Sequence, residues 1–218
     1  MSTLSIPPAL GPGDPAPDFT LPTVHRDGTI SLADYRGRSP LLVALFRGLY
    51  CPFCRRAIAQ LGMTGEKLRG LGVETLAVVA TQLERARLYF RYRPTRLPLV
   101  ADPELRALRA FRVPKPAMTP ELEAERRRVR INPTGELPEP LSVPDAANRL
   151  DELDHFEWTG TDTEEMEQQV PQLVGQFLVD RDGIIRWVNI ETAEEGLAGL
   201  GKFPTDDEFL AAARALPS

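Results

Sequence analysis

The sequence is poor in cysteine and histidine, with two of each in 218 residues. A structural zinc site needs four ligands, commonly two Cys or His pairs, and His25 and His155 each stand alone. Zinc binding is therefore an unfavoured alternative, and we expect neither a metal nor a cofactor. We expect His25 in a solvated turn and His155, which lies among acidic residues, in a charge-paired surface position.

Long apolar runs and an excess of positive charge are also missing. No stretch approaches the roughly 20 apolar residues of a membrane span. The net charge of −5 argues against a dedicated nucleic-acid binder. Residues 1–15 have neither the basic segment nor the apolar core of a secretory signal, so we expect a cytoplasmic protein without nucleic-acid or membrane partners.

The apolar patterns predict an α/β fold. Residues 41–46 form an apolar run without alternation, which is typical of a strand buried on both faces. Strands alternate with helical patterns before residue 112, and this order predicts a sheet with helices on its faces. An N-terminal hairpin is expected within 15–32. The remaining expected elements are strands at 73–80, 97–100, 176–180 and 184–190 and helices at 82–92, 103–111 and 206–216.

Residues 113–172 interrupt this order with eight of the 21 prolines, and they contain one expected helix, at 120–130. Within them, residues 145–167 carry nine acidic side chains and one basic one. A solvated insertion is the favoured interpretation of this segment. A lid or a partner-binding surface is the alternative.

The two cysteines lie three apart, as Cys51 and Cys54, between the buried strand and the start of a helical pattern. Cytosolic pairs at this spacing are more often catalytic or metal-binding than structural. At a helix N-terminus, free N–H groups and nearby Arg47 would lower the pKa of Cys51 and favour its nucleophilic thiolate. Arg55 and Arg56 add charge unless they point into solvent. A buried, inert pair is the remaining alternative.

Three segments resemble the peroxiredoxin family, of the alkyl hydroperoxide reductase/thiol-specific antioxidant type. They are GDPAPDFTL at 13–21, LPLVADP at 97–103 and FLVDRDGIIR at 177–186. The resemblance covers about residues 13–112 and 173–190. It implies a thioredoxin-like fold with a central mixed sheet and helices on both faces. We expect a single domain, 1–218, with its core at 13–112 and 173–216 and an insertion at 113–172.

The cysteine motif departs from that family. Its signature is Pro-x-x-x-Thr-x-x-Cys, and this chain has Ala44 and Gly48 at the Pro and Thr positions when aligned on Cys51. Alignment on Cys54 places Arg47 and Cys51 there instead. Before the strand at 177, where relatives have an Arg or a cis-proline, the chain has Val174 and Gly175. The CPFC motif with its preceding Tyr is similar to the active sites of thioredoxins and glutaredoxins.

These observations predict a thiol-disulfide oxidoreductase or thiol peroxidase that uses a CxxC dithiol. Cys51 is expected to attack from an exposed helix end and Cys54 to resolve the product. Arg47, Tyr50 and Phe53 are expected to bind substrate. Because the family's peroxide-binding donors are missing from the motif, we expect faster disulfide exchange than peroxide reduction.

The predicted partners are a peroxide or disulfide substrate and a thiol donor of the thioredoxin or glutathione type. A homodimer is left open. A non-enzymatic redox-sensing or partner-binding module is the alternative function, and a turnover assay separates the two.

Overall fold

The computed structural model describes residues 10–217 and has seven strands, seven α-helices and two short 3-10 helices. Residues 1–9, which belong to the N-terminal segment assessed above for a secretory signal, lie outside this range. The strands are β1 (Thr20–Pro22), β2 (Thr29–Ser31), β3 (Leu41–Phe46), β4 (Glu74–Val79), β5 (Leu99–Ala101), β6 (Gly175–Val179) and β7 (Ile185–Ile190). The helices are η1 (Leu32–Asp34), α1 (Pro52–Arg69), α2 (Leu83–Tyr92), α3 (Arg106–Ala110), α4 (Pro120–Arg128), α5 (Val143–Asp154), α6 (Gly160–Gln169), η2 (Gly196–Gly199) and α7 (Asp206–Arg214).

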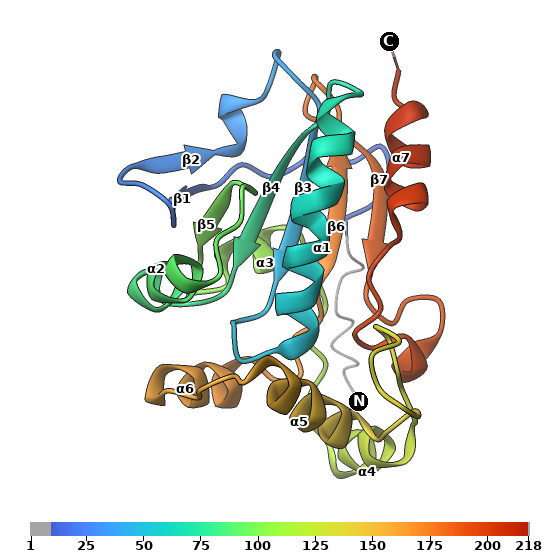
Figure 1. Ribbon diagram of the computed structural model, residues 1–218. Coiled ribbons are helices and arrows are strands. Elements are labelled where there is room, and N and C mark those ends of the chain that lie inside the picture. The colour runs from blue at the N-terminus through green and yellow to red at the C-terminus, as the bar shows by residue number, and fades with distance from the viewer. Residues whose placement is uncertain (1–9, 218) are drawn as a thin grey trace, which may run out of the picture.

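A five-stranded mixed sheet forms the centre of the molecule, with strand order β5-β4-β3-β6-β7 (Figure 1). Strands β3, β4 and β5 run parallel to one another, whereas β6 is antiparallel to both β3 and β7. The expected buried strand is the central one, and all six of its residues are buried. The predicted central mixed sheet is confirmed.

Helices cover both faces of this sheet, because the side chains of β3 alternate between two apolar cores. Leu42, Ala44 and Phe46 face the core under α1 and α7. Leu41, Val43 and Leu45 face the core that also contains α3. In Figure 1, α1 and α7 lie in front of the sheet and α3 lies behind it. The predicted thioredoxin-like layering is therefore confirmed.

Two hairpins and the closing helix also match the sequence prediction. Strands β1 and β2 pair antiparallel in the N-terminal hairpin. The turn between β6 and β7 contains Gly183 at φ +84°, a backbone conformation that glycine adopts easily. Thr205 caps α7 in a capping box with Glu208.

The insertion at 113–172 contains more regular structure than the sequence predicted. The expected helix at 120–130 is present as α4, but α5 and α6 were not predicted. Ser142 caps α5, and Thr159 caps α6 with Asp162 in a capping box. All three helices lie together at the end of the molecule where α1 begins (Figure 1). The insertion therefore lies next to the cysteine motif.

No helix within residues 10–217 is long and apolar enough to cross a membrane.

Candidate active site

The cysteine motif joins the end of β3 to the start of α1. A turn closes at Cys51, whose N–H donates to the Gly48 carbonyl at 3.1 Å, and Cys51 is the N-cap of the helix. Pro52 occupies the first helical position, where a missing N–H costs no helical hydrogen bond. The helix-start position predicted for the pair is confirmed.

The two sulfurs differ in ionisation. The Cys54 N–H donates to Cys51 Sγ at 3.3 Å, and both cysteines are free thiols. Burial opposes the Cys51 thiolate. The hydrogen bond from the Cys54 thiol and the positive charge of Arg47 outweigh burial and lower the pKa of Cys51 to about 6. Burial and the neighbouring Cys51 raise the pKa of Cys54 well above its ordinary value. Cys51 is therefore the more acidic thiol.

Neither cysteine is exposed, which corrects the expectation that Cys51 occupies an exposed helix end. Cys51 is 4% exposed and Cys54 is 2% exposed. The physical reason is the insertion, because its helices lie over the N-terminal end of α1. Their docking depends on contacts far apart in the sequence.

Arg47 lies beside Cys51 in the turn after β3. Its guanidinium is buried, donating to the Gln172 carbonyl at 2.9 Å and pairing with Glu191 Oε1 at 3.0 Å. Burial opposes its charge, but Cys51 and Glu191 outweigh this and raise the pKa of Arg47 well above its ordinary value. Its Nε is buried and has no hydrogen-bond partner among residues 10–217. Arg47 is thus a fixed cation whose Nε–H is free to donate.

Tyr50 supplies a second unused donor. Its hydroxyl is buried and has no hydrogen-bond partner within the described residues. Burial raises the pKa of Tyr50 well above its ordinary value, so the hydroxyl stays protonated at neutral pH. It can therefore donate one hydrogen bond to a molecule beside it.

A cavity of about 190 Å³ adjoins these groups. It brings together four of the five predicted site residues: Arg47, Tyr50, Cys51 and Phe53. Cys54 is not among its lining residues and borders a much smaller void of about 10 Å³. The rest of the lining is mainly apolar and comes largely from the insertion: Pro116, Leu122, Arg126, Val143, Pro144, Ala147, Asn148, Asp151, Trp158, Met166, Val170 and Pro171, with Pro52, Leu173, Leu197 and Leu200 from the core.

Sequence reasoning missed Glu191 and Pro171. The Glu191 carboxylate is fully buried and accepts from the N–H groups of Val174 and Gly201 as well as from Arg47. The Val170–Pro171 peptide bond is cis, and Pro171 lines the cavity. The chain therefore has a cis-proline near the site after all. The only signal for it was a proline shortly before β6.

Arg55 and Arg56 contact the insertion and do not point freely into solvent. Arg55 pairs with Asp151 at 2.6 Å and with Asp154 at 2.8 Å, and its side chain is 2% exposed. Arg56 pairs with Asp154 at 2.8 Å and with Glu136 at 2.7 Å. The two arginines hold the insertion against the first turn of α1.

The acidic segment at 145–167 is solvated only in part, because five of its nine acidic side chains are exposed and three are buried. Asp151, Asp162 and Glu165 are all buried. Asp162 pairs with Arg85 of α2 at 2.8 Å. The Glu165 carboxylate accepts from the Gln82 N–H at 2.7 Å and the Thr81 hydroxyl at 3.0 Å. Two of these three buried carboxylates, Asp151 and Asp162, are therefore paired with arginines inside the molecule.

The histidines take no part in this site. His25 is exposed, as expected, and its Nε2 lies 3.1 Å from the Leu97 carbonyl. His155 is exposed at the C-cap of α5, and within residues 10–217 it forms none of the charge pairs expected for it. Within residues 10–217, no cluster of three or more His, Cys, Asp or Glu is arranged to hold a metal ion.

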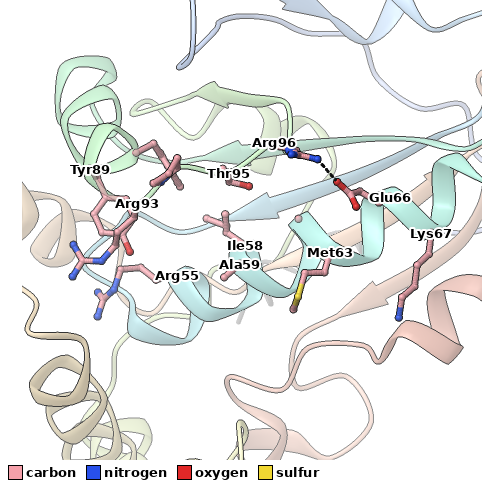
Figure 2. A pocket seen from close by; sticks show the side chains of 13 residues that line it. Arg55, Ile58, Ala59, Met63, Glu66, Lys67, Tyr89, Arg93, Thr95 and Arg96 are labelled. Atoms are coloured by element: carbon pink, nitrogen blue, oxygen red, sulfur yellow. Dashed lines mark hydrogen bonds and ion pairs between the residues drawn. The ribbon is translucent and has the colours of Figure 1, made fainter.

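A larger groove, of about 680 Å³, lies along the outer side of α1 next to α2 (Figure 2). Neither cysteine lines it. At one end, Arg55, Tyr89 and Arg93 lie together, and Arg93 donates to the Asp154 carbonyl at 2.8 Å. The residues at that end of the groove therefore contact the insertion.

Comparisons with solved structures show the same fold. The peroxidoxin BcpB from Mycobacterium tuberculosis has a TM-score of 0.58 at 14% identity, covering 96% of this chain and 99% of that one. The reduced 2-Cys peroxiredoxin of Plasmodium vivax has 0.59 at 14%, covering 94% and 81%. The mitochondrial 2-Cys peroxiredoxin of Plasmodium falciparum has 0.56 at 12%, covering 93% and 92%. At these identities the likeness concerns the fold alone.

No curated protein sequence matches this chain. The model of the AhpC/TSA family matches residues 12–139, which is more than half of the chain. This match agrees with the mixed sheet, the cysteine at the start of α1 and the peroxiredoxin neighbours. The chain belongs to the AhpC/TSA family, with a peroxiredoxin-like thioredoxin fold.

Proposed function

We propose that this protein is a thiol peroxidase in which Cys51 attacks a peroxide and Cys54 resolves the product. One arrangement carries the proposal: the Cys51 sulfur, with a pKa of about 6, borders a small cavity beside two buried donors that have no partner in the described part of the chain. Such donors stabilise charge that develops on oxygen. Family membership supports thiol-dependent redox chemistry, and the site supports these residues for it.

The reaction has two steps on the protein. The Cys51 thiolate attacks one peroxide oxygen, so that an S–O bond forms and the O–O bond breaks. This leaves Cys51 as a sulfenic acid and releases an alkoxide or hydroxide, which takes up a proton. The Cys54 sulfur then displaces water from the sulfenic acid and forms a disulfide. Two thiol groups of an external donor reduce that disulfide and become oxidised themselves.

The other predicted site residues have separate roles in this proposal. Arg47 keeps Cys51 ionised, and its free Nε can donate to the peroxide. The Tyr50 hydroxyl donates to the departing oxygen. Phe53 and the apolar lining exclude water, which strengthens these interactions.

The sequence alone led us to expect slower peroxide reduction than disulfide exchange. That expectation rested on the missing Thr and Arg of the family signature. Arg47 and Tyr50 place donors beside Cys51 from different positions in the chain. We therefore propose that peroxide reduction is the faster reaction while the insertion covers the site.

Disulfide reduction is the second candidate function, favoured by the Cys51–Cys54 spacing. In either case the partner is a thiol donor of the thioredoxin or glutathione type, and the chain acts as one domain with an insertion at 113–172. The cytoplasmic location stays a prediction from the sequence. The non-enzymatic alternative, a redox-sensing or partner-binding module, predicts no catalytic turnover of peroxide or disulfide.

The test compares second-order rate constants for hydrogen peroxide and for a model disulfide on the same reduced protein at neutral pH. Mass spectrometry after one equivalent of peroxide identifies the first oxidised sulfur. A larger peroxide constant with oxidation at Cys51 supports the proposal. A larger disulfide constant favours the second candidate, and no turnover with any thiol donor favours a redox sensor.

A further inference from the structure

Helices α5 and α6 and their connecting loop, residues 143–169, cover the cysteine motif. Five residues of α5 line the cavity beside Cys51, and Trp158 and Met166 line it from the loop and α6. With these residues in place, Cys51 is 4% exposed. A cavity of about 190 Å³ has room for a small peroxide, whereas the low exposure of Cys51 leaves little of its sulfur at the surface for a protein thiol.

Polar contacts hold most of this cover. The buried residues of α6 are Asp162, Glu165 and Gln169, none of which is apolar. Gln169 accepts from the Gly48 N–H at 2.8 Å and donates to the Ala80 carbonyl. Asp162 pairs with Arg85, as described above. Release of α6 would therefore expose mainly groups that water can hydrate, so it costs less than release of an apolar face.

The loop and the end of α5 are held in the same way. Asp154 accepts from Arg55 Nε and Nη2 and from Arg56 Nη1. The Arg55 guanidinium also stacks on the Phe156 ring at 3.8 Å. Val143, Ala146 and Leu150 are the apolar residues that α5 buries, and they are concentrated in its first two turns. The charged end can separate while the first turns stay docked.

Resting on the function proposed above, we infer that residues 143–169 are a lid that selects reactants by size. The closed lid admits small oxidants to Cys51. It must open before a protein-sized thiol donor or disulfide can reach the sulfur. The ion pairs of Arg55 with Asp154 and of Arg85 with Asp162 set the fraction of open molecules. These four residues are thus specificity determinants that do not touch the substrate.

Alkylation of the reduced protein by two maleimides tests this inference without any peroxide. One reagent is N-ethylmaleimide, and the other is the same group on a long polyethylene glycol chain. Mass spectrometry quantifies the label on Cys51. We expect the large reagent to react at least about tenfold more slowly than the small one in the wild type. Equal rate constants after correction for their rates with free cysteine would overturn the lid.

Asp154→Asn removes the charge that binds Arg55 and Arg56 and should increase the rate constant for the large reagent about tenfold. Tenfold corresponds to about 1.4 kcal/mol, within the range for a hydrogen bond to a charged group. The small reagent should change much less. Glu152→Gln is the matched control, because this exposed α5 carboxylate pairs with exposed Arg149 and not with the core. We define the size ratio as the rate constant for the small reagent divided by that for the large one. A size ratio in Asp154→Asn equal to that of the wild type would contradict the inference.

Asp162→Asn provides a second variant at the other end of the lid, with exposed Glu164→Gln as its control. Like Asp154→Asn, it should decrease the size ratio, and an unchanged ratio would count against the lid. Circular dichroism verifies that each variant is folded. Because alkylation requires no turnover, a protein inactive toward peroxide can still show the size ratio. Failure of the proposed function is thus distinguishable from failure of the lid.

Discussion

The carboxylate of Glu165 occupies the space that a side chain at position 48 would need. A Cβ atom on Gly48 would lie 2.7 Å from Glu165 Oε2 and 3.0 Å from the Ala80 carbonyl oxygen. Position 48 is where the peroxiredoxin signature has threonine in the alignment on Cys51. The insertion and the missing threonine are therefore linked, because α6 packs where that side chain would lie.

Gly48→Ala should consequently destabilise the protein, and Glu165→Ala should remove part of that effect. We expect the two changes to be non-additive by about 0.5 kcal/mol or more in the free energy of unfolding, measured by urea denaturation in a double-mutant cycle. Gly160→Ala is a control, since a Cβ there meets no atom within 4 Å. Strict additivity would show that the Tyr50 ring and the Ala80 carbonyl limit position 48 without Glu165.

The alkylation rate of Cys51 should follow a titration with its midpoint near pH 6, because only the thiolate reacts. Arg47→Met should raise the midpoint by about one unit, since it removes the nearest cation. This variant also carries Glu191→Gln, because the Glu191 carboxylate would otherwise stay buried without its partner Arg47. Iodoacetamide rates across pH provide the measurement, with Arg127→Met as a control at an exposed arginine. A midpoint near the ordinary cysteine value in the wild type would contradict the assignment.

Cys51→Ser should abolish peroxide consumption, whereas Cys54→Ser should consume one equivalent and stop. In the second variant the sulfenic acid on Cys51 has no resolving thiol, so it persists and can be trapped by dimedone. Mass spectrometry locates the adduct. A Cys51→Ser protein that still consumes one equivalent would assign the attack to Cys54.

Tyr50→Phe should reduce the rate constant for hydrogen peroxide by about a hundredfold or more, because it removes one donor to the developing oxygen charge. It should leave the pH midpoint of alkylation unchanged, which separates this role from an effect on the thiolate. Tyr92→Phe is the matched control at a residue that is 74% exposed. Equal peroxide constants for Tyr50→Phe and the wild type would exclude the tyrosine from the reaction.

Glu165→Gln should gain stability relative to the wild type as pH rises. Burial raises the pKa of Glu165 to about 7 in the folded state, above its ordinary value of 4.5. The folded protein therefore holds a proton that the unfolded chain releases between these values, and the wild type loses stability across this window. Glutamine does not titrate. Urea denaturation across the window measures the difference, and Glu164→Gln, at an exposed residue, should show none.

Local sequence signals were sufficient for the frame of this site. The apolar run at 41–46 predicted the central strand, and Cys51 followed by Pro52 predicted the start of α1. Helix α6 could not be predicted in this way. Its buried face is polar, and the partners that make it buried, such as Arg85 and Gly48, lie about 80 to 120 residues earlier in the sequence.

The burial of the cysteines was missed for the same reason. It depends on how the insertion docks, which no local pattern encodes. Arg47 could be predicted because it lies within the turn that carries Cys51. Its buried partner Glu191 lies 144 residues later, at the end of an edge strand.

The contact between Arg55 and Asp154 also has an evolutionary consequence. These residues lie 99 positions apart, and their ion pair joins the first turn of α1 to the end of α5. A descendant that lost residues 143–169 but kept Arg55 would lose both carboxylate partners of that guanidinium. One that replaced the arginine alone would leave Asp151 and Asp154 without this cation. We therefore expect the arginines after the CxxC motif and the acidic segment to be gained or lost together. Their co-occurrence would be a signature for finding the lineage that shares this cover.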